Sequence, residues 1–221
     1  STEKILTMDF VSGIKVSDLA ELEHRGWDRK VLAERGSNLI LEQIFLHGFF
    51  HGDPHPGNIF ILPDHVICFL DFGMMGTVSQ SQRADFAELV LGYAQRDEGK
   101  ILRALLKIVE WEEEPNRRRM ERDVAEFVGI YLYRPLKELR VETMMKRLLE
   151  LIHRHRLRIP SDIFLMMKAL GTAEGVGSML DPDFQLAEKM TPFLRRLQMD
   201  RLRPGSILQG VWESGGEFLM L

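Results

Sequence analysis

The sequence has little cysteine, no excess of basic residues and no long apolar run, and each absence excludes a class of protein. Cys68 is the only cysteine, so an intrachain disulfide is impossible and a reducing compartment is expected. The formal net charge of -4 gives no basic surface for nucleic acid, so no nucleic-acid partner is expected. No apolar run approaches the length of a membrane span, and the N-terminus shows no signal-peptide pattern.

The residues that are present describe an ordinary globular domain. A length of 221 residues with 45% hydrophobic side chains is enough for one well-buried core. Apolar periodicity, capping residues and prolines predict a mainly α fold (α+β) with one small β-hairpin. The expected helices cover residues 18–23, 28–49, 79–96, 98–110, 116–133, 141–157, 161–179 and 184–199. The expected strands are 5–11, 59–62 and 66–70, with a turn at 63–65.

Three polar side chains around this hairpin suggest chemistry. Asn58 follows Asp53 by five residues and Asp71 follows it by eighteen, all within FHGDPHPGNIFILPDHVICFLDFG. Phosphoryl-transfer enzymes use one carboxylate to orient an attacking hydroxyl or water, and an Asn and a second carboxylate to hold magnesium on a nucleotide. The spacing therefore predicts a magnesium–nucleotide site.

The motifs resemble those of protein-kinase-like enzymes. HGDPHPGN is similar to their catalytic loop, and Asp71, Phe72 and Gly73 are similar to their magnesium-binding DFG turn. The resemblance implies that Asp53 is the catalytic aspartate and that Asn58 and Asp71 are magnesium ligands. It also implies that residues 8–11 (MDFV) form the strand and hinge that receive adenine, through backbone groups of Asp9 and Val11.

Longer phrases resemble one family in particular. FVSGIKVSDL, GFFHGDPHPGNIF, LDFGMMG and the later LRIPSDIFLMMKALGTAEGVGSMLDPDF are similar to the UbiB family of atypical kinase-like proteins. This resemblance implies ATP and Mg as cofactors and a kinase or ATPase activity that supports ubiquinone biosynthesis. It also implies a place at the cytoplasmic face of a membrane, with anionic lipid or quinone-pathway proteins as partners.

The same resemblance divides the chain into three parts. Residues 1–15 would be the end of an N-terminal-lobe strand and the hinge, 16–199 the protein-kinase-like C-terminal lobe, and 200–221 a poorly ordered tail. The Lys and Glu pair and the small-residue loop that cover nucleotide in this fold are not recognisable ahead of the hinge. We therefore expect weak magnesium–nucleotide affinity and no turnover from these 221 residues alone, and activity only in a protein that has both lobes.

Departures from ordinary protein kinases narrow the expected activity. Gly52 stands where an Arg would pair with a phosphorylated activation segment, so control by that pairing is not expected. His55 stands where a Lys is usual, so charge neutralisation at the phosphate would depend on protonation of this cofactor-binding histidine. Only a short segment separates Gly73 from the helix cap at Ser79, which argues against a peptide substrate.

Several alternatives stay open. The loop also resembles that of small-molecule kinases of the aminoglycoside or choline type, and the protein could instead be a non-catalytic nucleotide- or lipid-binding scaffold. His51, Asp53 and His55 alternate as in some metal hydrolases, although no second ligand cluster is visible. A basic run with His153 and His155 is either a solvated helix face or a lipid contact. Met166, Met167 and Met179 are expected in the core, and Gly175 and Gly177 at a close packing point or helix end.

Overall fold

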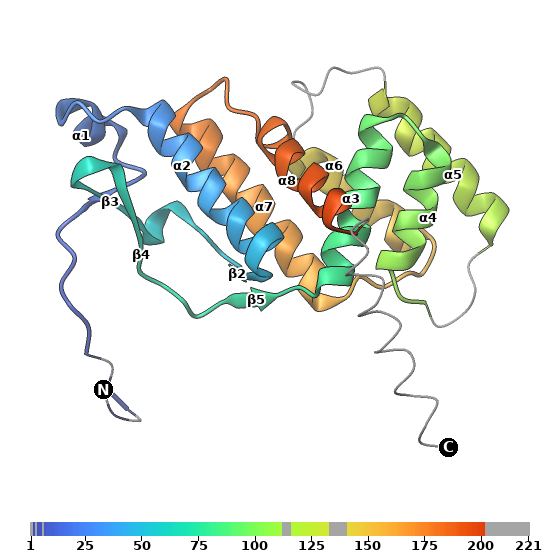
Figure 1. The fold of residues 1–221 in the computed structure, drawn as a ribbon, viewed down its shortest axis with the longest axis horizontal. Coiled ribbons are helices and arrows are strands. Elements are labelled where there is room, and N and C mark those ends of the chain that lie inside the picture. The colour runs from blue at the N-terminus through green and yellow to red at the C-terminus, as the bar shows by residue number, and fades with distance from the viewer. Residues whose placement is uncertain (1, 3, 6, 112–115, 133–140, 202–221) are drawn as a thin grey trace.

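The computed structural model describes residues 2, 4–5, 7–111, 116–132 and 141–201. Within them the chain is mainly helical with two small antiparallel sheets, so the expected fold class is confirmed. The strands and the first two helices lie at one end, and the remaining helices extend from α2 and α7 toward the other (Figure 1).

The N-terminal segment differs from the prediction. No strand forms among the described residues of 5–11, and the first strand, β1 (Ile14–Lys15), pairs antiparallel with β3. Met8 and Phe10 are 60% and 94% exposed, and the segment runs away from the body of the molecule (Figure 1). An apolar run becomes a strand only where a neighbouring strand accepts its hydrogen bonds, and no strand pairs with the part of this run that the structure describes.

The first helices carry the chain to the polar loop. α1 (Leu19–His24) is capped by the carboxylate of Asp18, and α2 (Arg29–Glu42) by that of Asp28. A turn of π-helix (Gln43–His47) continues α2, so the long helix predicted over 28–49 ends two residues early. Gly48 ends it with φ of 70°, where a Cβ would also lie 2.6 Å from the carbonyl oxygen of Val78.

A strand pair that was not predicted follows the π-helical turn. β2 (Phe49–His51) pairs antiparallel with β5 (Met75–Thr77). Both strands have three residues, too short for a recognisable pattern, and each depends on the other for hydrogen bonds. This pair ties the start of the polar loop to the segment just after Gly73.

The predicted hairpin is confirmed. β3 (Ile59–Leu62) and β4 (Val66–Phe69) pair in register, with Ile59 opposite Phe69, and with β1 form a three-stranded sheet in the order β1, β3, β4. The turn at Pro63–His65 places Asp64 and His65 at positive φ.

The remaining helices lie close to their predicted ranges. They are α3 (Gln80–Ala94), α4 (Glu98–Ile108), α5 (Arg117–Leu132), α6 (Val141–Arg154), α7 (Ser161–Leu180) and α8 (Leu186–Arg201). Ser79 and Gln82 form the predicted capping box, in which each accepts a hydrogen bond from the other's backbone N–H. The tail predicted from residue 200 falls, from residue 202 on, outside the described residues.

α7 is the central helix of the core. It packs against α2 and α8, and Met166 and Met167 on it are buried as predicted, while Met179 is partly buried beside the hairpin. Gly177 is a close packing point, because a Cβ there would lie 2.3 Å from the ring of Phe184. Contrary to the sequence expectation, α7 is long and apolar enough to cross a membrane by length and composition, but 50% of its most apolar window is buried in this fold.

Candidate functional site

His51 holds the backbone of the polar loop in place. Its side chain is 2% exposed, and its Nδ1 accepts the backbone N–H of Asp53 at 3.1 Å. Its own backbone N–H donates to Gln43 Oε1 at 2.9 Å, and the centre of its ring lies 5.3 Å from that of Phe69 and 5.8 Å from that of Phe72. The predicted role of His51, to hold the loop by hydrogen bonds, is confirmed by these contacts.

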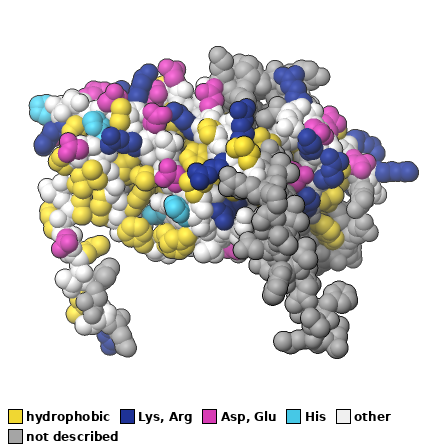
Figure 2. All heavy atoms as spheres, in the orientation of Figure 1, with side chains coloured by type: hydrophobic (Ala, Val, Ile, Leu, Met, Phe, Trp, Pro, Cys, Tyr) yellow, Lys and Arg dark blue, Asp and Glu magenta, His cyan; other side chains and the backbone are white. Residues whose placement is uncertain are grey.

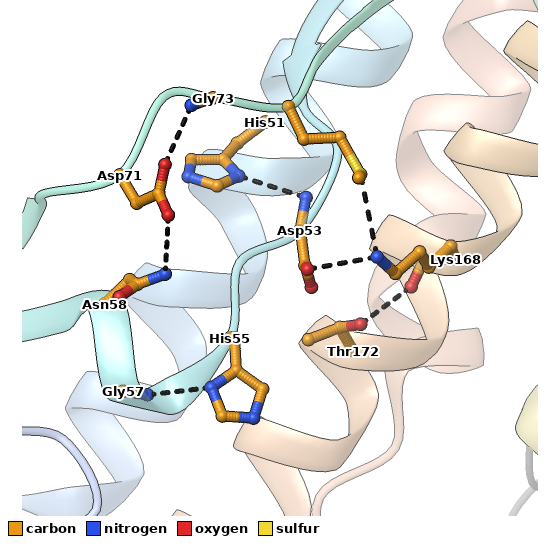
Figure 3. Close-up of polar contacts among 10 residues, drawn as sticks. His51, Asp53, His55, Gly57, Asn58, Asp71, Gly73, Lys168 and Thr172 are labelled. Carbon is orange, nitrogen blue, oxygen red and sulfur yellow. Dashed lines mark hydrogen bonds and ion pairs between the residues drawn. The ribbon is translucent and has the colours of Figure 1, made fainter.

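Asn58 and Asp71 face each other across the base of the hairpin (Figure 3). Asn58 Nδ2 donates to Asp71 Oδ2 at 3.3 Å, and the N–H of Gly73 donates to Asp71 Oδ1 at 2.8 Å. The backbone N–H of Leu70 donates to the carbonyl of Asn58 at 3.0 Å, so the two segments are joined directly. The structure therefore brings together the two residues that the sequence predicts as magnesium ligands.

The donor set of this pair fits magnesium. The Asp71 side chain is exposed, and one amide and one carboxylate supply the hard oxygen atoms that Mg²⁺ prefers. The amide nitrogen of Asn58 makes the contact to Asp71, which leaves its amide oxygen without a hydrogen bond among the described residues. Magnesium usually binds one or two carboxylates together with phosphate oxygens, and this pair meets that requirement.

Asp53 has a partner that the sequence did not suggest. Lys168 of α7 lies 115 residues further along the chain, and its Nζ donates to Asp53 Oδ2 at 3.0 Å (Figure 3). The same Nζ lies 3.6 Å from Met74 Sδ, directly after the Asp71 turn. Lys168 therefore connects the loop of Asp53 with the turn of Asp71.

Gly52 explains how α7 comes so near. A Cβ at this position would lie 2.7 Å from the side chain of Leu165, a partly buried residue about one helical turn before Lys168 on α7. The residue that replaces the arginine of ordinary protein kinases thus makes room for a helix. The sequence shows that the arginine is absent but does not show this structural consequence.

The other predicted nucleotide-binding residues are not joined to this group by any described contact. His55 is exposed, and its Nδ1 accepts the N–H of Gly57 at 3.2 Å. Asp9 and Val11 lie in the N-terminal coil, so the strand expected there does not form.

The metal-hydrolase alternative finds no support. Among the described residues there is no group of three or more His, Cys, Asp or Glu side chains that could hold a metal ion. His51 Nδ1 is taken up by the backbone of Asp53, and His55 Nδ1 by that of Gly57. Both histidines therefore use their Nδ1 atoms to bind the backbone of their own loop.

The basic run near the end of α6 is not simply a solvated face. His153 is exposed, but the side chain of His155 is only 4% exposed and its Nε2 lies 2.9 Å from Asp123 Oδ2, while Arg154 Nη1 lies 3.4 Å from the same oxygen. Burial alone would raise the pKa of Asp123, but the contacts from His155 and Arg154 outweigh it and hold the pKa below its ordinary value. Two members of the run therefore join α6 to α5.

Comparison with known families agrees with this arrangement. Residues 1–105 match the ABC1 atypical kinase-like domain, and residues 124–185 match the UbiB helical domain. The chain belongs to the UbiB family of atypical kinase-like proteins. The first match contains the loop and the hairpin, and the second contains most of α5 and all of α6 and α7, so Lys168 comes from the helical domain of the family.

Individual UbiB relatives support the same assignment. A probable protein kinase UbiB from Shewanella baltica is 31% identical over 212 residues, 94% of this chain and 39% of that protein. The chloroplastic protein ACTIVITY OF BC1 COMPLEX KINASE 7 of Arabidopsis thaliana is 31% identical over 198 residues, 89% of this chain and 28% of that protein. The chain thus spans roughly a third of the length of the curated relatives it matches.

A solved structure shows the same fold. The structure of Rv3197 with erythromycin from Mycobacterium tuberculosis superposes with a TM-score of 0.52 at 18% identity, covering 84% of this chain and 49% of that one. At this identity the likeness establishes the kinase-like fold and nothing about ligands.

Proposed function

We propose that this chain forms the catalytic part of an atypical kinase or ATPase that binds magnesium–ATP and supports ubiquinone biosynthesis. The contact between Asn58 and Asp71 carries the proposal, because it joins an amide and a carboxylate at a kinase-like turn. Membership of a kinase-like family supports a phosphotransferase activity in general, and relatives named UbiB suggest the link to quinones.

Each of the three polar residues would have a separate role. Asn58 and Asp71 would hold magnesium, and the bound magnesium nucleotide would supply the phosphoryl group. The Asp53 carboxylate would orient the attacking hydroxyl or water and accept its proton, while Lys168 holds that carboxylate toward α7. His51 keeps the loop backbone in position for this geometry.

We propose that turnover requires segments beyond these 221 residues. Phe72 and Phe49 are 60% and 54% exposed although they flank the candidate site, and Met74 is 42% exposed. Hydrophobic side chains gather on the face over the strands (Figure 2), and a nucleotide-covering lobe would bury such a face. With that lobe in place, Asp9 and Val11 would receive adenine and His55 would lie near the phosphates.

The proposal also includes partners at a membrane. A place at the cytoplasmic face of a membrane, next to anionic lipid or quinone-pathway proteins, would suit the exposed basic residues His153 and Arg156. Arg154 and His155 contribute less, because both contact Asp123.

Calorimetric titration of the purified chain tests the proposal. We expect weak binding of ATP that requires magnesium and is lost when a chelator removes the metal, without steady release of ADP. Binding that is equally strong in excess chelator would contradict the ligand roles of Asn58 and Asp71. Steady hydrolysis by these residues alone would contradict the need for another lobe.

A further inference from the structure

A cavity of about 340 Å³ lies between α6 and α7, beside the candidate site. Leu149 of α6 and Phe164 and Gly171 of α7 form apolar parts of its wall. Its volume is within the range of small-molecule sites, roughly 300–1,000 Å³. The proposed kinase chemistry does not use this space.

The charged side chains in the wall are all positive. The polar part of the wall consists of Lys146, Lys168 and the uncharged Thr172, and no acidic side chain is among the described residues that line the cavity. The Thr172 hydroxyl donates to the carbonyl of Lys168, one turn earlier on α7 (Figure 3). A cavity with apolar walls and lysines suits a ligand that has an apolar body and a negative end. A positively charged ligand, or one with polar groups along its body, would be disfavoured because those groups would be buried without partners.

We propose that this cavity binds a small amphipathic molecule whose single anionic end pairs with Lys168. The Lys168 side chain is 39% exposed and its ammonium group already bonds Asp53 Oδ2, so that group can serve both anions at once or turn from one to the other. A lysine has three donors on a flexible stem, which permits such sharing. Occupation of the cavity is therefore coupled to the position of the Asp53 carboxylate.

Gly171 makes this inference testable without damage to the fold. A Cβ at Gly171 would have no atom within 4 Å, so a larger side chain there projects into free space and occupies part of the cavity. Gly175, one turn further along the same helix, is exposed and equally free of neighbours, but it does not line the cavity. Both glycines lie inside a helix, where leucine is the better helix former, so neither Gly171→Leu nor Gly175→Leu is expected to unfold the chain.

The experiment is calorimetric titration of the purified chain with octyl phosphate, in the absence of magnesium and nucleotide. We expect saturable binding that weakens at least tenfold in Gly171→Leu and stays unchanged in Gly175→Leu. Lys168→Gln should weaken octyl phosphate about tenfold, as expected for loss of a charge-assisted contact, and leave binding of 1-octanol unchanged. Octyltrimethylammonium should bind more weakly than octyl phosphate.

Other outcomes would overturn the proposal. Equal binding by Gly171→Leu and the parent chain would show that the cavity is not the site. Equal affinity for octyl phosphate and octyltrimethylammonium would remove the preference for an anion. Because no metal or nucleotide is present, failure here leaves the magnesium–nucleotide proposal untouched, and failure of magnesium–ATP binding leaves this one untouched.

Discussion

The candidate site has two halves that are built differently. Asn58 and Asp71 are 13 residues apart, and one hairpin brings them together. Asp53 and Lys168 are 115 residues apart and meet only because α7 packs across the polar loop. The local half is visible as a motif, whereas the long-range half depends on how the helical domain packs on the kinase-like domain. Three experiments can break or sharpen this comparison, and a fourth tests a long-range contact between α5 and α6.

The largest effect is expected in the local half. Asp71→Asn keeps the size of the side chain but removes the charge that would hold magnesium, so magnesium-dependent ATP binding should fall at least 100-fold, or about 3 kcal/mol. Calorimetric titration measures the loss. Asp64→Asn in the exposed hairpin turn is a matched control that tolerates the positive φ there and should bind normally. Equal binding by Asp71→Asn would remove the proposed ligand role.

The second largest effect is expected where α7 packs closely against the polar loop at Gly52. Gly52→Ala forces a Cβ to within 2.7 Å of Leu165, and overpacking of this kind costs about 1–3 kcal/mol. Urea unfolding followed by circular dichroism measures the change. Gly171→Ala meets no atom within 4 Å and should be neutral or stabilising by up to about 1 kcal/mol. If both variants had the same stability, the contact between Gly52 and Leu165 would not limit the packing of α7.

A smaller effect is expected from Asp123, which links α5 and α6 away from the site. Its folded-state pKa is lowered from 3.8, because the contacts from His155 and Arg154 outweigh burial. A lowered carboxyl pKa stabilises the fold above the unfolded pKa, and this stability is lost as the pH falls through the folded pKa. Between about pH 6 and about pH 3 the parent chain should therefore lose more stability than Asp123→Asn.

Thermal unfolding across this pH range measures the difference. Asp97→Asn is the control, because Asp97 caps α4 and asparagine caps equally well. An acid response of Asp123→Asn identical to that of the parent would show that this carboxylate does not contribute.

The smallest effect on stability is expected from the ion pair of Asp53 and Lys168. Both side chains are more than a third exposed, and such pairs contribute about 0.2–1 kcal/mol. A double-mutant cycle with Asp53→Asn and Lys168→Met, measured by urea unfolding, gives their coupling. A coupling well above this range would mean that the pair is a structural element. A small coupling energy would mean that the pair contributes little to stability and that Lys168 acts through the chemistry of Asp53.

Much of the fold was predictable because its signals are local. The capping box of Ser79 and Gln82, the hairpin turn at Pro63 and the apolar faces of the helices each depend on neighbours a few residues away. The predicted strand over 5–11 was wrong and the pair of β2 and β5 was missed for the same reason. A strand forms only with a partner strand, and a short stretch of sequence does not show which segment that partner is.

The sequence by itself determined the types of side chain at the site and their order. Asp53, Asn58 and Asp71 at kinase spacing, with the UbiB phrases around them, were enough to predict the fold class and the family. Only the tertiary structure decided that Lys168 meets Asp53, that Gly52 admits Leu165, and that a cavity opens between α6 and α7. The physical reason is that these contacts join residues far apart in the chain, and their distances follow from how whole helices pack, which no local pattern contains.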